Sequence, residues 1–289
     1  MKFRNIFVCT AMINCYNHNG EPEEAIHLFQ EMQTQDQLEP NMVSLVTVLP
    51  VCSSLCSLVG GKQVHGYAIR KKIDHFTSLS NALVDMYCKC GSLGSARTLF
   101  DSNFFCRDSI SWSSIICGYG MHGNGTEAVK LYNQMLKSEQ KTDQISVLGA
   151  LTACSKSGLV TQGIEIFYTS MNFYGIKPTV EICASVVDML GRSGQLKSAL
   201  EFIKSMPIKP GPTVWGSLLS SSILHRNSEM VHLAYKSLTE LEPENPSNYV
   251  SIANVHASSR KWNHAAQIRT AMKELGIRKS PGRSWVTIG

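Results

Sequence analysis

The chain has 289 residues, of which 43% are hydrophobic and 17% are charged, and its formal net charge is +5 at pH 7. No run of about 18 consecutive apolar residues occurs, which excludes a transmembrane helix and predicts no membrane partner. The ten cysteines include no Cys-x-x-Cys spacing, and none of the nine histidines lies in a His-Glu-x-x-His or His-x-Glu pattern. We therefore expect free thiols in a reducing compartment and no metal site.

A small residue recurs along the chain at a nearly constant interval. Successive members are 36, 35, 32, 35 and 36 residues apart: Ala25, Gly61, Ala96, Ala128, Gly163 and Ala199. A glycine stands five residues before five of these six positions, and Cys56 takes that place once. A period of this length is typical of stacked helical repeats, in which each unit contacts only its neighbours.

Each period predicts a hairpin of two helices. In the first, apolar residues of helical spacing run from Ala11 to Tyr16, Gly20 follows, and a second apolar stripe runs from Ala25 to Met32. The same outline returns over residues 82–100 and 115–132. Because glycine adopts the left-handed conformation at no steric cost, we expect it to end the first helix of a hairpin. The sequence therefore predicts an all-α solenoid.

Two segments carry a resemblance to a known family. Residues 81–93, NALVDMYCKCGSL, resemble the short repeat of plant pentatricopeptide repeat proteins, and residues 60–67, GGKQVHGY, resemble the long repeat. Alternating repeat lengths are the hallmark of the PLS subclass. The resemblance implies a right-handed superhelical solenoid with six repeats in the order P-L-S-P-L-S: 6–41, 42–76, 77–108, 109–143, 144–179 and 180–211.

The chain after Gly211 resembles the E region of the same family, over residues 212–289. Residues 214–219, 241–243 and 249–254 resemble two E motifs, expected at 212–245 and 246–280, and Pro281-Gly282 resembles the PG box that ends the region. Trp215, Trp262 and Trp285 are expected to pack within hairpins. The DYW deaminase domain that follows in the longest members is missing from this sequence. The resemblance thus implies no catalytic residue and no cofactor here, with the deaminase supplied in trans.

Repeats of this family read single-stranded RNA one base at a time. In the resemblance, the fifth and the last residue of a repeat select the base, because their side chains donate to and accept from its edge. Three pairs are legible: Thr10 with Asn41 for adenine, Asn81 with Asp108 for uracil, and Ser113 with Asp143 for guanine. The other pairs are apolar or small: Val46 with Phe76, Leu148 with Thr179, and Ala184 with Gly211.

The second residue of each repeat is assigned to sandwiching the bases. Apolar side chains fill this position in four repeats, namely Phe7, Val43, Ile110 and Ile145, whereas Ser78 and Glu181 depart from the pattern. The predicted preference is A-x-U-G-x-x. An alternative remains for Asn41, Asp108 and Asp143, because Asn and Asp directly before a helix are favoured as N-caps whatever the ligand.

The resemblance implies a factor that recognises a C-to-U editing site in organellar RNA and recruits a DYW-type deaminase and other organellar editing factors. On family habit we expect the mitochondrion, with the chloroplast as the alternative. No transit peptide is visible before the first repeat, which is typical of an N-terminally truncated product or of one not imported as it stands. Three alternatives stay open: an RNA stability or splicing factor, a protein-interaction scaffold, and a truncated non-functional fragment.

Charge is concentrated at the end of the chain. Residues 260–289 hold seven basic residues and one acidic residue, so they carry +6 and the preceding residues carry −1. This segment is either a solvated basic helix and tail or a contact for phosphates or an acidic partner.

Overall fold

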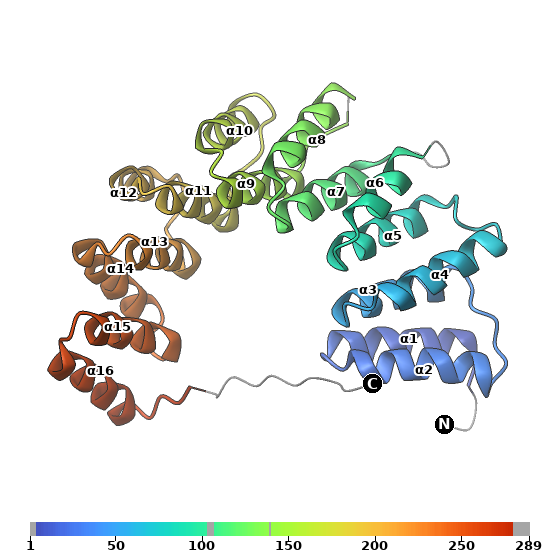
Figure 1. Cartoon of the computed structure of the whole chain (residues 1–289), viewed down its shortest axis with the longest axis horizontal. Helices are drawn as coiled ribbons and strands as arrows, with labels where there is room; N and C mark the ends of the chain where they lie inside the picture. Colours follow the sequence, from blue (N-terminus) through green and yellow to red (C-terminus); the bar gives the residue numbers. More distant parts are fainter. Residues whose placement is uncertain (1–3, 103–106, 139, 280–289) are drawn as a thin grey trace. The chain divides into compact units, whose positions relative to one another are not determined.

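The computed structural model describes residues 4–102, 107–138 and 140–279, and the regular elements there are helices (Figure 1). The prediction of an all-α fold is confirmed. The chain divides into two compact units, residues 1–176 and residues 177–289. The first unit contains α1 (Ile6–His18), α2 (Pro22–Thr34), α3 (Met42–Ser54), α4 (Leu58–Arg70), α5 (Thr77–Lys89), α6 (Leu93–Asp101), α7 (Ser109–Met121), α8 (Gly125–Lys137), α9 (Gln144–Ser157) and α10 (Val160–Asn172). The second contains α11 (Val180–Arg192), α12 (Leu196–Ser205), α13 (Pro212–Leu224), α14 (Ser228–Leu241), α15 (Pro246–Ser258) and α16 (Trp262–Glu274).

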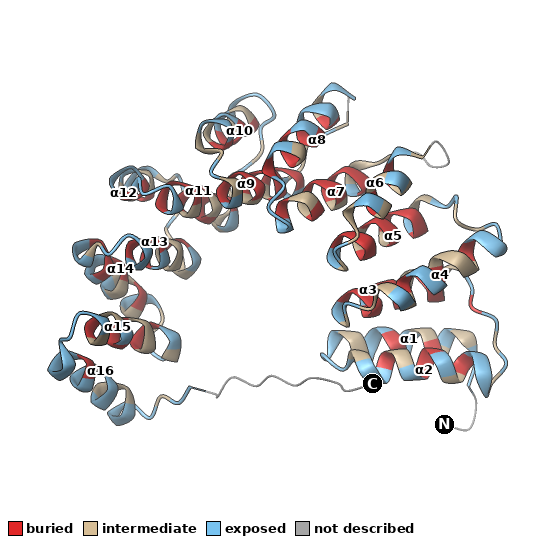
Figure 2. Cartoon of the chain, viewed as in Figure 1, coloured by how far each residue is buried: buried red, intermediate tan, exposed pale blue. Residues whose placement is uncertain are grey.

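In the first unit the odd-numbered helices form one layer and the even-numbered helices a second layer. Helix α1 packs on α3, α3 on α5, α5 on α7 and α7 on α9. Each even-numbered helix from α2 to α8 packs on the odd helix before it and on the one after it. Buried residues therefore line the odd helices and the inward faces of the even ones (Figure 2).

Small residues allow this close packing. Ala25, Ala96 and Ala128 have no exposed surface, and Gly61 is also buried. A Cβ atom added at Gly61 would overlap the thioether of Met86 on the neighbouring α5. The periodic small residue is thus the position at which the second helix of a hairpin approaches its neighbour most closely.

The expected turn glycines adopt the left-handed conformation. The five glycines have φ between 69° and 82°: Gly20, Gly91, Gly123, Gly158 and Gly194. Cys56 replaces glycine in the second hairpin and still has φ of 49°. Position, and not only residue type, therefore determines the backbone at these turns, as expected where tertiary packing outweighs local preference.

In the second unit, α11 packs on α13, and α13 with α14 and α15 with α16 form hairpins. Throughout the chain, each expected repeat or E motif begins at the first residue of an odd-numbered helix. Two second helices are short: α6 has 9 residues and α12 has 10, whereas most others have 13. The expected PG box at Pro281-Gly282, and Trp285, lie outside the described residues.

One packing expectation is wrong. Trp262 is the first residue of α16 and is 65% exposed, whereas Trp215 in α13 is half-buried. Helix α16 is the last helix of the described chain and packs mainly on α15. Its only buried residue is Ala265. Sequence spacing does not reveal which helix ends a stack.

The cysteines of the described ranges are free thiols. Burial raises the pKa of seven of them, to about 12 for Cys88 and to about 11 for Cys52, Cys117, Cys154 and Cys183; the other two are Cys9 and Cys90. These thiols stay protonated at neutral pH and pack as small apolar groups. Within the same ranges no cluster of three or more His, Cys, Asp or Glu residues could hold a metal ion, and no helix is long and apolar enough to cross a bilayer.

Candidate nucleic-acid interface

At the second position of four odd-numbered helices, large apolar side chains are exposed to solvent. Phe7 in α1 is 77% exposed, and the corresponding side chains of α3, α7 and α9 are 57–61% exposed: Val43, Ile110 and Ile145. Ser78 and Glu181, which occupy this position in α5 and α11, are exposed as well. The recurrence of exposed apolar side chains at homologous positions makes these helix starts a candidate contact surface.

The last residues of four expected repeats cap the next helix with their side chains: Asn41, Asp108, Asp143 and Thr179. Asn41, Asp108 and Asp143 precede α3, α7 and α9, and their side chains accept hydrogen bonds from the backbone N–H groups of the third helical residues at 3.0, 2.8 and 2.8 Å. A serine at each third position completes a capping box. The capping alternative is therefore realised at all three positions.

Two of these caps also contact the fifth residue of their own repeat. The Ser113 hydroxyl donates to Oδ1 of Asp143 at 3.3 Å. The Asn81 amide donates to Oδ1 and Oδ2 of Asp108 at 3.0 and 3.3 Å. The structure thus brings together two of the residue pairs that the sequence predicted.

The third pair, Thr10 and Asn41, lines a shared pocket of about 320 Å³. The exposed Phe7 and Val43 line the same pocket. Two further polar residues contribute, Asn14 and Thr47, which the sequence did not indicate. Asn14 follows Thr10 by four residues, so the i, i+4 rule for one helix face would have found it.

The members of a pair are not equally accessible. Asn81 and Ser113 are 6% and 5% exposed, whereas Asp108 and Asp143 are half-buried. Burial alone would raise the pKa of the Asp108 carboxyl, but hydrogen bonds donated by Ser111 and Asn81 outweigh it and hold the pKa below its ordinary value. Asp108 is therefore an anionic acceptor at neutral pH.

Comparison with known proteins places this geometry in a family. The family pattern described as PPR repeat matches residues 7–36, 78–102, 110–139 and 182–209, and the pattern described as E motif matches residues 225–287. The chain belongs to the pentatricopeptide repeat family. The four PPR matches fall within the first, third, fourth and sixth expected repeats, and the E-motif match begins inside the first expected E hairpin.

The relatives are plant proteins. The chain is 39% identical over 290 residues to the chloroplastic pentatricopeptide repeat-containing protein CRR2 of Arabidopsis thaliana, covering all of this chain and 44% of the relative. A mitochondrial pentatricopeptide repeat-containing protein of the same plant is 40% identical over 278 residues, which is 96% of this chain and 39% of that protein. The chain spans less than half the length of these relatives.

A solved pentatricopeptide repeat structure shares the fold. The crystal structure of PPR10 in complex with an 18-nucleotide psaJ RNA element matches with a TM-score of 0.74 and 18% identity, over 94% of this chain and 40% of that one. PPR10 from maize without a named ligand matches with a TM-score of 0.62. These likenesses establish the helical-hairpin solenoid.

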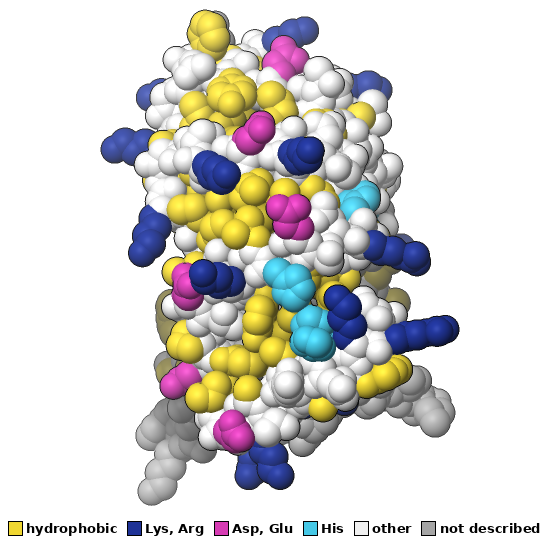
Figure 3. Space-filling model, turned by 90° about the vertical axis from the view of Figure 1, so that its left-hand side faces the viewer, with side chains coloured by type: hydrophobic (Ala, Val, Ile, Leu, Met, Phe, Trp, Pro, Cys, Tyr) yellow, Lys and Arg dark blue, Asp and Glu magenta, His cyan; other side chains and the backbone are white. Residues whose placement is uncertain are grey.

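The basic residues near the end of this PPR chain are solvated. Six of the seven lie in the described residues, and all six are exposed: Arg260, Lys261, Arg269, Lys273, Arg278 and Lys279. Figure 3 looks onto part of the second unit, where Lys and Arg side chains are spread among hydrophobic and histidine side chains. Exposed cations of this kind are available for sequence-independent contact with phosphates.

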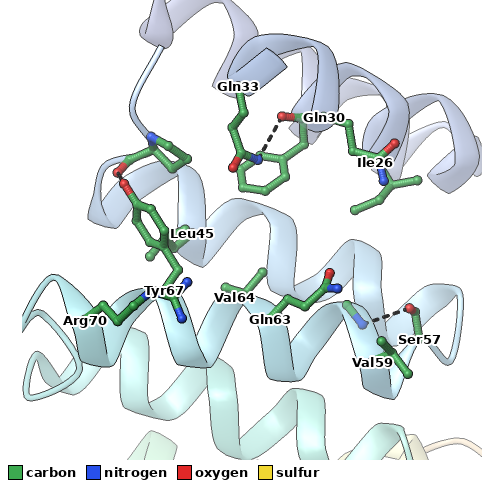
Figure 4. A pocket seen from close by; sticks show the side chains of 13 residues that line it. Ile26, Gln30, Gln33, Leu45, Ser57, Val59, Gln63, Val64, Tyr67 and Arg70 are labelled. Atoms are coloured by element: carbon green, nitrogen blue, oxygen red, sulfur yellow. Dashed lines mark hydrogen bonds between the residues drawn. The ribbon is translucent and has the colours of Figure 1, made fainter. Parts of the chain in front are cut away.

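A larger pocket of about 480 Å³ lies between the even-numbered α2 and α4 (Figure 4). The side chains of Gln30, Gln33, Gln63 and Arg70 surround it, and the Tyr67 hydroxyl donates to the Pro40 carbonyl at its edge. This pocket belongs to the layer of second helices. The caps and the second-position side chains belong to the layer of first helices.

Proposed function

We propose that this chain binds single-stranded organellar RNA and specifies a site for C-to-U editing, with the deaminase supplied by a partner. The observation that supports this proposal is a row of fifth-residue and N-cap side chains that lie beside exposed apolar side chains. These groups occupy the first turns of odd-numbered helices that pack side by side. The positions recur once per hairpin, although not every hairpin fills them with such side chains, and this recurrence suits a ligand that itself repeats, one nucleotide at a time.

Each pair offers chemistry suited to a different base. The side-chain oxygens of Asp108 and Asp143 accept hydrogen bonds, which suits the ring N–H of uracil and of guanine. Thr10 and Asn41 can both donate and accept, which suits the edge of adenine. The proposed preference is therefore A-x-U-G-x-x.

The exposed apolar residues would hold the bases from above and below. Phe7 and Val43 lie on successive repeats and line one pocket with the first selecting pair. A base between them would cover both side chains, and stacking on an aromatic ring contributes about 1 to 3 kcal/mol per base. Ser78 and Glu181 offer less apolar surface, so we expect weaker contact there.

Three findings from known proteins support this proposal. The PPR10 structure of the same fold is a complex with RNA. Relatives of this chain are named as chloroplastic and mitochondrial proteins, and we favour the mitochondrion, with the chloroplast as the alternative. The E motif is the basis for proposing a DYW-type deaminase and other editing factors as partners in trans.

Binding is tested with labelled single-stranded RNA that contains A-x-U-G-x-x and with the same RNA changed at the three named bases, at two salt concentrations. We expect tighter binding of the first RNA at both salts. Equal and strongly salt-dependent binding of both would reduce the activity to phosphate contact by the basic segment. No binding of either would favour a protein-interaction scaffold or an inactive fragment.

A matched pair of variants locates the RNA on the protein. Phe7→Ala should weaken binding by about 1 to 3 kcal/mol because a stacking surface is lost. Phe173→Ala is the control, since Phe173 lies in the same unit and is 83% exposed but follows α10, an even-numbered helix. Equal effects of the two substitutions would contradict the proposed interface.

The editing role is tested in plants that lack the protein, by sequencing organellar transcripts. Loss of C-to-U conversion at a cytidine a few nucleotides 3′ of an A-x-U-G-x-x segment would support it. Unchanged editing together with altered transcript abundance or splicing would instead favour a stability or splicing factor.

A further inference from the structure

Three serines occupy equivalent places in the first unit. Ser44, Ser111 and Ser146 are the third residues of α3, α7 and α9, and each is 0% exposed. Each backbone N–H donates to the cap side chain, and each hydroxyl accepts from the backbone N–H of the cap residue at 2.8 to 3.1 Å. As capping groups the three serines are interchangeable.

The hydroxyl protons are used differently. Ser44 and Ser146 donate to the backbone carbonyl of their own cap residue, Asn41 or Asp143, at 2.9 Å. The Ser111 hydroxyl instead lies 2.6 Å from Oδ1 of Asn81, on the preceding odd-numbered helix and 30 residues away. It also lies 2.9 Å from Oδ1 of Asp108. A hydroxyl has one proton, and we assign it to the shorter of the two contacts, the one with Oδ1 of Asn81.

The contact with Ser111 completes a set of hydrogen bonds that fixes both ends of the Asn81 amide. Oδ1 accepts from Ser111, and Nδ2 donates to the two carboxylate oxygens of Asp108. The reversed amide would place Oδ1 against the carboxylate, where two acceptors repel each other. Held in this way and buried, Asn81 keeps its donor group on Asp108.

The carboxylate of Asp108 is the accessible end of this network. Oδ1 accepts from the Ser111 N–H at 2.8 Å and from Asn81 at 3.0 Å, while the bond from Asn81 to Oδ2 is longer, at 3.3 Å. Oδ2 therefore retains more capacity to accept a further donor. The pair offers an incoming base an acceptor rather than a donor.

We propose that Ser111 is a positioning residue for base selection: by orienting Asn81, it makes the Asn81–Asp108 pair favour a base with a ring N–H. The inference rests on the proposed function and deepens it. Uracil carries a proton on N3, whereas cytosine has an unprotonated N3 that the carboxylate would repel. With Ser111 absent, Oδ1 of Asn81 loses its hydrogen bond and only Asp108 still orients the amide, so the preference for uracil over cytosine weakens.

The test compares Ser111→Ala with Ser146→Ala. Binding is measured on two RNAs that differ only by uracil or cytosine at the third base of A-x-U-G-x-x. Both variants lose a capping hydroxyl and should melt at reduced temperatures, and Ser111→Ala should melt at the lower one because it also leaves Oδ1 of the buried Asn81 without its donor. Ser111→Ala should also lose about two- to tenfold of the uracil preference, the effect expected for one hydrogen bond. Ser146→Ala should retain that preference, and Ser111→Thr, which keeps the hydroxyl, should restore it.

The outcomes separate this inference from the proposed function. A wild-type chain without preference between the two RNAs would overturn both. A wild-type preference that Ser111→Ala preserves would overturn only the role of Ser111. An equal loss of uracil preference in Ser111→Ala and Ser146→Ala would also overturn it, because capping alone would then explain the effect.

Discussion

Replacement of Gly118 by alanine tests how closely the first helices pack. Gly118 lies in the middle of α7 and is buried against α5. A Cβ atom there would overlap both Sγ and Cβ of Cys88, whose side chain has no exposed surface. Since Cβ is fixed to the backbone, α5 and α7 must separate. Such overpacking costs about 1 to 3 kcal/mol.

The matched control is Gly66→Ala in the middle of α4. The nearest atom to a Cβ there is Arg70 Nη1 at 3.6 Å, which is an ordinary contact. Both substitutions gain about 0.8 to 1 kcal/mol of helix propensity. The difference between the two variants therefore isolates the overpacking cost, and we expect about 1 to 3 kcal/mol from urea unfolding followed by circular dichroism. If Gly118→Ala stabilises the chain as much as Gly66→Ala, the close packing of α5 and α7 is refuted.

Two further predictions concern titratable groups. Asp108→Asn keeps an N-cap acceptor, so the unfolding free energy should change by only a few tenths of a kcal/mol. The preference of the chain for uracil should fall. A large loss of stability without loss of this preference would contradict the assignment of Asp108 to base selection. Burial, followed by the nearby imidazoles of His232 and His264 and the ammonium of Lys261, lowers the pKa of His256. The unfolded state then binds the proton more readily than the folded state, so the second unit should lose stability as pH falls below about 6.5. Thermal melts at pH 7.5 and 5.5 should show a smaller loss for His256→Gln. An unchanged pH dependence in this variant would exclude His256 as the source of the loss.

Much of the fold could be predicted because its signals are local. Gly20 and the other turn glycines mark where the first helices end, and the periodic small residues mark the close contacts. The candidate site was only partly predictable. The positions of Asn81 and Asp108 within their repeat identified them as a pair. They did not indicate that Asn81 is buried more deeply than Asp108, because exposure depends on the register between neighbouring helices. The role of Ser111 was hidden for the same reason, since its sequence context matches that of Ser146.

The two short second helices show where this architecture tolerates a change of length. Helices α6 and α12 have 9 and 10 residues, whereas the first helices of the same hairpins, α5 and α11, have 13. The difference in length is therefore confined to the second helices of these two hairpins. The even-numbered helices of these hairpins differ in length from their counterparts, and the odd-numbered helices match most of theirs. A change of length in a second helix can thus alter the even-numbered layer while the first helices, which carry the caps and the second-position side chains, keep their length.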